Sequence, residues 1–166
     1  MNRFQKILMA TDFSDASAPA WRRAVEMAAE NGAELFVVNA FSPPHYLEAG
    51  PMSPRLYDEC DKYLRAEVGS KLGLLINDAA RSGVAAKPLV LVGNPEEAIV
   101  NAALENHVEL IIMGTHGRKG VSRFFLGSVA SRVIATAPCP VLTERADNVA
   151  PQRRPVEDRV MVGAIA

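Results

Sequence analysis

The chain has 166 residues, the length of a single domain. Apolar residues make up 49% and charged residues 22%, a balance that is ordinary for a globular protein and sufficient to fill one core. The net charge of −1 at pH 7 argues against a nucleic-acid partner, because nucleic-acid phosphates call for clustered Lys and Arg side chains.

Cysteine positions and hydropathy indicate the compartment. Cys60 and Cys139 lie far apart and form no Cys-x-x-Cys pair, so neither a disulfide scaffold nor a zinc cluster is expected. No stretch approaches the roughly 20 apolar residues that span a bilayer, and no signal-peptide cleavage site follows the N-terminus. We therefore expect a cytoplasmic protein that contacts no membrane.

The start of the chain predicts a strand followed by a helix. Residues 6–11 form a short apolar run, as in a buried strand. After a turn, Ser14 or Asp15 can cap a helix that ends before Gly32. Pro19 is tolerated only near a first turn, so this helix is expected to begin later than Ser14.

A second strand and a long helix come next. Residues 33–41 are an apolar run, and residues 42–53 are rich in Pro, Gly and Ser and predict a mobile loop. Ser53 and Pro54 have the chemistry of a helix start, and the helix should reach about Ser82. One apolar face is predicted along it: Leu56, Cys60, Leu64, Val68, Leu72, Leu75, Ile76 and Ala79.

Two more strands flank a third helix. Residues 84–92 form the third strand, and Pro88 inside it predicts a position at the edge of the sheet, because proline cannot donate to a ladder. Asn94 is expected to cap the next helix, with Pro95 in its first turn. Residues 108–113 form the fourth strand.

A glycine-rich segment, a helix at 127–137 and a short strand from Pro140 to Thr143 complete the pattern. Strands that are apolar on both faces and alternate with helices predict an α/β fold. We expect a doubly wound, open, five-stranded parallel sheet with helices on both faces, similar to the Rossmann fold. Residues 1–145 are predicted to form the domain, and residues 146–166 a flexible tail.

The segment 114–129 carries the candidate chemistry. It runs from the end of the fourth strand to the start of the last helix, and both points lie at the carboxyl edge of the sheet, where such folds bind ligands. Gly114 and Gly117 permit close approach of the backbone to a ligand. Gly127 and Ser128 begin the helix, where free N–H groups and the positive end of the dipole favour an anion.

Side chains within this segment leave alternatives open. Arg118, Lys119 and Arg123 add positive charge beside the site, but they also suit a solvated loop. The spacing is neither a Walker A loop nor Gly-x-Gly-x-x-Gly, so a glycine-rich connector before a capped helix is the alternative interpretation. His116 has no orienting partner in the sequence, which favours a solvated histidine over a catalytic one.

Four pieces of the sequence form a longer pattern: Ile-Leu-Met-Ala-Thr-Asp-Phe-Ser at 7–14, Gly-Asn-Pro at 93–95, Leu-Ile-Ile-Met-Gly at 110–114, and Gly-x2-Gly-x9-Gly-Ser at 114–128. Through them the chain resembles the universal stress protein family from about Lys6 to Thr143. In that family the glycine spacing marks the branch that binds ATP.

The resemblance implies roles by position. Asp12 would lie by the ribose and adenine, Ala40 would line the adenine pocket, and Met113 would lie near the ribose. The glycine segment would hold ribose and phosphates, largely through backbone N–H groups. The implied cofactor is ATP, or else AMP or ADP, with Mg²⁺ left open and no metal ligand assigned. The predicted cofactor-binding residues are Thr11, Asp12, Ala40, Met113, Gly114, Gly117, Arg118, Gly127, Ser128 and Val129.

Two architectural expectations also follow from the resemblance. The strand order would be 3-2-1-4-5, which agrees with the edge position that Pro88 predicts for the third strand. A homodimer would form through the fifth strand, from Pro140 to Thr143, which would protect that edge from open pairing.

Three functions are compatible with the sequence. The favoured one is an adenine-nucleotide-binding stress-response or regulatory protein that acts through nucleotide-dependent dimer or partner contacts. A slow ATPase or phosphotransferase is the alternative, but phosphoryl transfer needs a nucleophile, a metal site and charge clamps, and only Asp12 is an evident ligand. An interaction module with an empty site is the third, and the intact glycine pattern argues against it.

Overall fold

The computed structural model describes residues 4–42, 53–115 and 126–145. Five parallel strands form one sheet in the order β3-β2-β1-β4-β5, which confirms the predicted fold. The strands are β1 (Lys6–Ala10), β2 (Glu34–Phe41), β3 (Ala86–Val92), β4 (Leu110–Gly114) and β5 (Val141–Glu144). The helices are η1 (Asp15–Ser17), α1 (Ala18–Asn31), α3 (Pro54–Arg81), α4 (Pro95–Glu105) and α5 (Ser128–Thr136).

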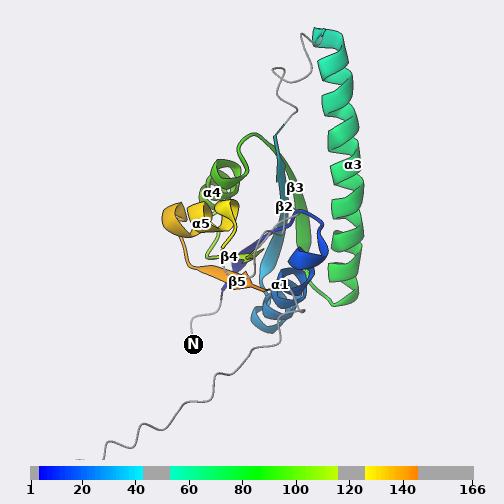
Figure 1. The fold of residues 1–166 in the computed structure, drawn as a ribbon. Coiled ribbons are helices and arrows are strands. Elements are labelled where there is room, and N and C mark those ends of the chain that lie inside the picture. Colours follow the sequence, from blue (N-terminus) through cyan, green and yellow to red (C-terminus); the bar gives the residue numbers. More distant parts are fainter. Residues whose placement is uncertain (1–3, 43–52, 116–125, 146–166) are drawn as a thin grey trace, which may run out of the picture.

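Helices cover both faces of the sheet: α1 and α3 lie on one side, and α4 and α5 on the other (Figure 1). Successive side chains of a strand point to opposite faces, so the central strand serves two cores. Ile7 and Met9 of β1 pack in one core with Leu72 of α3. Leu8 packs in the other with Val133 of α5. All five of these side chains are fully buried.

The predicted chain reversals and the edge strand are confirmed. Gly32 ends α1 with φ 64°, a left-handed conformation that favours glycine, and its neighbour Ala33 donates its N–H to the carbonyl of Ala28 at 2.9 Å. The strand β3 lies at one edge of the sheet, and Pro88 sits within it. The missing N–H of proline therefore removes no bond from a central ladder.

Two predicted helix caps are not formed. The short turn η1 precedes α1, which begins at Ala18, later than Ser14 as the position of Pro19 predicts. The Ser14 hydroxyl donates to Asp12 and caps no helix. Asn94 occupies the N-cap position of α4, but its side chain accepts no hydrogen bond from that helix. Ser53, by contrast, accepts the Leu56 N–H and caps α3.

The predicted apolar face of α3 is wrong at its first position. Leu72 and Ala79 are buried, whereas Leu56 is 47% exposed. A 28-residue helix is about 42 Å long, and the seven-residue strand β3 is about 23 Å long, so the helix extends beyond the sheet (Figure 1).

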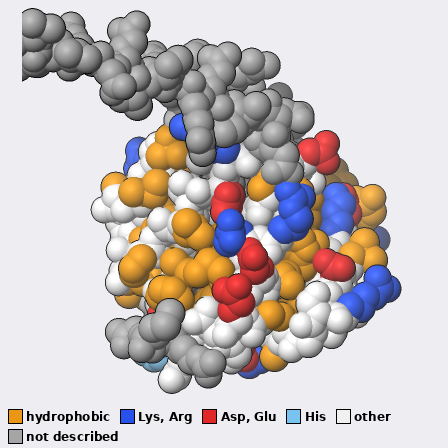
Figure 2. Space-filling model, turned by 90° about the horizontal axis from the view of Figure 1, so that it is seen from below, with side chains coloured by type: hydrophobic (Ala, Val, Ile, Leu, Met, Phe, Trp, Pro, Cys, Tyr) orange, Lys and Arg blue, Asp and Glu red, His pale blue; other side chains and the backbone are white. Residues whose placement is uncertain are grey.

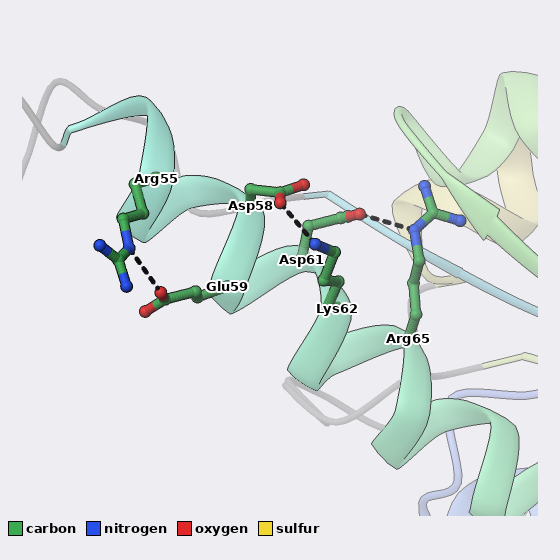
Figure 3. Close-up of polar contacts among 6 residues, drawn as sticks. All are labelled: Arg55, Asp58, Glu59, Asp61, Lys62 and Arg65. Carbon is green, nitrogen blue, oxygen red and sulfur yellow. Dashed lines mark hydrogen bonds and ion pairs between the residues drawn. The ribbon is translucent and has the colours of Figure 1, made fainter.

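Side-chain ion pairs follow the protruding half of α3. Figure 3 shows them spaced four residues apart along the helix: Arg55–Glu59, Asp58–Lys62 and Asp61–Arg65. Such exposed pairs each stabilise a helix by only about 0.3–0.5 kcal/mol. The ion pairs therefore support this half of α3 only weakly, whereas the other half packs against the core through Leu72 and Ala79.

The surface and the helices of the structure match the mixed charge and moderate hydropathy of the sequence. Figure 2 shows one face of the molecule on which acidic and basic side chains are interspersed beside a group of hydrophobic ones. Across the described ranges, none of the helices combines the length and the apolar character that crossing a membrane requires. Both cysteines are free thiols, and burial raises the pKa of the Cys139 thiol, which disfavours its reactive thiolate form.

Candidate functional site

The three central strands β1, β2 and β4 lie side by side where β1 ends. Ala10, the last residue of β1, lies opposite Val38 of β2 and Met113 of β4. The Thr11 N–H donates to the Val38 carbonyl at 2.9 Å, so the chain leaves β1 between its two neighbours. The connections from β1 lead outward to β2 and β3, whereas β4 and β5 lie on the other side of β1. This reversal is where doubly wound sheets bind ligands.

The turn after β1 forms the first wall of this site. Asp12 Oδ1 accepts two hydrogen bonds from Ser14, one from its N–H at 3.0 Å and one from its hydroxyl at 2.6 Å. Thr11 is buried, and its Oγ1 accepts the N–H of Phe13 at 3.0 Å. The predicted ligand residues Thr11 and Asp12 are therefore held in a turn whose side chains bond to its own backbone.

The start of α5 forms the second wall. The Gly127 N–H donates to the carbonyl of Thr115, directly after β4, at 2.8 Å. The Ser131 N–H is the first to bond within the helix, to the Gly127 carbonyl at 2.9 Å. Helix geometry leaves the N–H groups of the three preceding residues, Ser128, Val129 and Ala130, without a carbonyl in α5. Gly127 is the N-cap and has no side chain to satisfy them.

Apolar side chains also lie at this edge of the sheet. Ala40 at the end of β2 and Val129 in the first turn of α5 are half-buried, and both pack against the core cluster that contains Met113. Gly114 ends β4 beside them. The structure thus brings these predicted residues to one region of the carboxyl edge. Gly117 and Arg118 lie outside the described residues.

The composition of the two walls fits an anionic ligand with an apolar part. Backbone N–H groups at a helix start, together with the positive end of its dipole, bind phosphate oxygens. Ala40 is half-buried and can offer apolar surface to a flat, weakly polar ring, whereas Met113 is buried in the core beneath this edge. Among the described residues, no group of three or more His, Cys, Asp or Glu side chains is arranged to hold a metal ion.

Three buried polar residues at this edge were not predicted. Ser17, Asn39 and Thr115 are between 5% and 7% exposed. Thr115 links three elements, because its N–H donates to the Glu144 carbonyl of β5 and its carbonyl accepts from Gly127. Asn39 interrupts an otherwise apolar run in β2, and this interruption was the one sequence signal that could have pointed to it.

The family model described as Universal stress protein family matches residues 3–145. The chain belongs to the universal stress protein family. A universal stress protein of Thermus aquaticus is 39% identical over 145 residues, which cover 86% of this chain and 99% of that protein.

Solved universal stress proteins share the fold. UspA from Lactobacillus plantarum superposes with a TM-score of 0.76 at 25% identity, over 87% of this chain and 100% of that one. A universal stress protein in complex with cAMP gives a TM-score of 0.66 at 25% identity, over 87% of this chain and 99% of that one. One from Archaeoglobus fulgidus in complex with dAMP gives 0.60 at 26% identity, over 86% and 98%.

Proposed function

We propose that this universal stress protein binds an adenine nucleotide, ATP in the first place, between the turn at residues 11–17 and the start of α5. One observation carries the proposal: α5 begins at Gly127 at the strand reversal, and among the described residues no side chain caps its first N–H groups, which point to the carboxyl edge. A phosphate is the ligand chemistry that suits this arrangement.

The similar structures support the proposal that the ligand contains adenine. One of them is in complex with cAMP and another with dAMP, and the two ligands share an adenine and a phosphate. In this chain Asp12 and Ala40 lie on the side of the site formed by β1 and β2, and we assign them to the adenosine part. Gly127, Ser128 and Val129 are assigned to the phosphates. Gly117 and Arg118 stay predicted members of the same site.

We further propose that the protein is a cytoplasmic stress-response regulator whose nucleotide occupancy changes its dimer or partner contacts. The bonds of Thr115 support such a link, because they join the start of α5 to the end of the edge strand β5. The homodimer predicted through the strand from Pro140 to Thr143 would use that edge. Among the described residues no contact favours slow ATP hydrolysis at the same site, and hydrolysis is an outcome to be measured.

Mass spectrometry of protein purified without added nucleotide, followed by thermal unfolding with millimolar ATP, tests the proposal. We expect bound ATP, or a rise in the melting temperature when ATP is added, because a ligand that binds only the folded state stabilises it. Bound ADP with phosphate release would favour the ATPase. Absence of nucleotide together with an unchanged melting temperature would contradict nucleotide binding.

The variant Gly127→Val tests whether the start of α5 binds the phosphates. Gly127 has φ −59° and ψ 151°, a conformation that valine adopts without strain, so the fold should persist while the added side chain fills the phosphate position. We expect ATP binding to be lost. The matched control is Ala135→Val, which adds the two methyl carbons of valine at an exposed position of the same helix and should leave the affinity unchanged. Unchanged affinity in Gly127→Val would remove α5 from the site.

A further inference from the structure

Buried polar side chains gather beneath the first wall of the site. Thr11, Ser17, Asn39 and Thr115 are the buried polar residues of the described ranges, and all four lie at or next to the carboxyl ends of β1, β2 and β4. Burying a polar group is unfavourable unless it is hydrogen-bonded. Their bonds therefore indicate what this cluster holds in place.

The hydroxyl groups of Ser17 and Thr11 form a directed chain. Ser17 Oγ donates its one hydrogen to the Ser14 carbonyl at 2.8 Å. The 3.1 Å contact between Thr11 Oγ1 and Ser17 Oγ must then run from Thr11 to Ser17. Thr11 Oγ1 in turn accepts the Phe13 N–H. These hydrogen bonds thus connect both ends of the turn, residues 11 and 17, to its middle residues.

Asn39 holds the same turn from the neighbouring strand. Its Nδ2 donates to the Thr11 carbonyl at 2.8 Å, across 28 residues of sequence. Together with the Thr11 N–H bond to Val38, every polar group of Thr11 is fixed by a hydrogen bond. The backbone and side chain of Thr11, which directly precedes Asp12, are therefore held in one conformation.

The turn needs such restraint because its backbone is strained. Phe13 has φ 61°, a left-handed conformation that is unfavourable for a bulky side chain. Its ring packs against the core, and Lys71 Nζ lies 5.7 Å from the ring centre. Without its hydrogen bonds the backbone would relax toward an extended form and carry Asp12 away from the strand end.

We propose that Ser17 and Asn39 are positioning residues for the nucleotide: they hold the turn from Thr11 to Phe13 so that Asp12 stays at the adenosine end of the site. This inference rests on the proposed function. The hydrogen bonds described for Ser17 and Asn39 go to other residues of the protein, so both residues act through Thr11 and Ser14.

The variant Ser17→Ala removes the hydroxyl that joins Thr11 to Ser14. We expect its ATP affinity, measured by calorimetry, to fall about tenfold, the size expected for one lost buried hydrogen bond. Affinity for inorganic tripolyphosphate should stay unchanged, because that ligand has no adenosine part to contact Asp12. Ser17→Thr retains the hydroxyl and should recover most of the ATP affinity. Asn39→Ala should weaken ATP binding without weakening tripolyphosphate binding.

Two further measurements separate positioning from general destabilisation. Amide hydrogen exchange of Phe13 and Ser14 in the nucleotide-free protein should accelerate in Ser17→Ala. Val84→Ala removes buried apolar atoms just before β3, away from the site, and should lower stability without changing ATP affinity.

Each outcome has a distinct meaning. If the wild-type protein fails to bind ATP, the proposed function fails and the inference fails with it. If the wild-type protein binds ATP and Ser17→Ala binds it equally well, the inference alone is overturned. Equal loss of ATP and tripolyphosphate affinity, or unchanged amide exchange at Phe13 and Ser14, would also overturn it.

Discussion

The two walls of the candidate site are built in opposite ways. In the turn at residues 11–17, side-chain hydroxyls and a carboxylate bond to the backbone and to one another. At the start of α5 the N-cap is Gly127, which has no side chain, whereas Ser53 caps α3 through its hydroxyl. The first wall is thus fixed before any ligand arrives. In the second, no side chain of the described residues accepts from the first N–H groups of α5, and we propose that a ligand phosphate does.

The variant Gly127→Asp should have the largest effect, because it gives the start of α5 a side-chain cap, which the first wall's turn already resembles, and that cap carries a negative charge. The carboxylate would accept the N–H groups that we assign to phosphate and would repel the phosphate itself. We expect ATP affinity to fall at least about 100-fold, a loss of about 2.7 kcal/mol. Urea unfolding should show the free energy of unfolding unchanged or raised by a few tenths of a kcal/mol.

Gly127→Asn is the matched control for charge. Asparagine caps a helix about as well as aspartate but carries no charge, so it separates occupation of the N–H groups from repulsion. We expect an affinity between that of the wild type and that of Gly127→Asp. If both variants bind ATP as the wild type does, the N–H groups of α5 hold no phosphate.

A change in the first wall should have a smaller effect. Ser14→Ala removes the 2.6 Å hydrogen bond to Asp12 Oδ1 but keeps the one from the Ser14 N–H. Because the carboxylate keeps one of its two restraints, we expect ATP affinity to fall about fivefold, or about 1 kcal/mol. Ser14→Thr keeps the hydroxyl and is the control. A loss as large as that of Gly127→Asp would show that the turn contributes more than the helix start.

The sequence was sufficient for the fold because its signals were local. Apolar runs, Gly32 after α1 and Pro88 in β3 each act within a few residues. All five strands, and the helices α3 and α5, begin and end within about two residues of their predicted bounds, whereas the short helix η1 was not predicted. The apolar face of α3 was mispredicted because helical spacing cannot show where the sheet ends. Leu56 has the same spacing as Leu72 but lies beyond the strands.

The position of the candidate site could be predicted from the sequence, but the residues that hold its turn in place could not. The carboxyl-edge rule predicted that Asp12 and Gly127 lie at the carboxyl edge of the sheet, and both do, because that rule depends only on strand order; their roles in binding stay predictions. Ser17 and Asn39 were missed, since their bonds to Ser14 and Thr11 depend on tertiary packing. The roles assigned to individual residues stay predictions until a ligand is bound.

Ionic strength offers the finest test of the contrast between the walls. Phosphates at the start of α5 would be held by charge and by the helix dipole, which salt screens, whereas adenosine contacts at the first wall depend on hydrogen bonds and apolar packing. Raising KCl from about 0.05 M to about 0.5 M should therefore weaken ATP binding about threefold and leave adenosine binding nearly unchanged. Titration calorimetry of both ligands at both salt concentrations measures the difference.

A parallel loss for ATP and adenosine would mean that the two walls do not divide the ligand into an electrostatic and a nucleoside part. Retention of the salt effect in Gly127→Val would move the phosphate contacts away from α5.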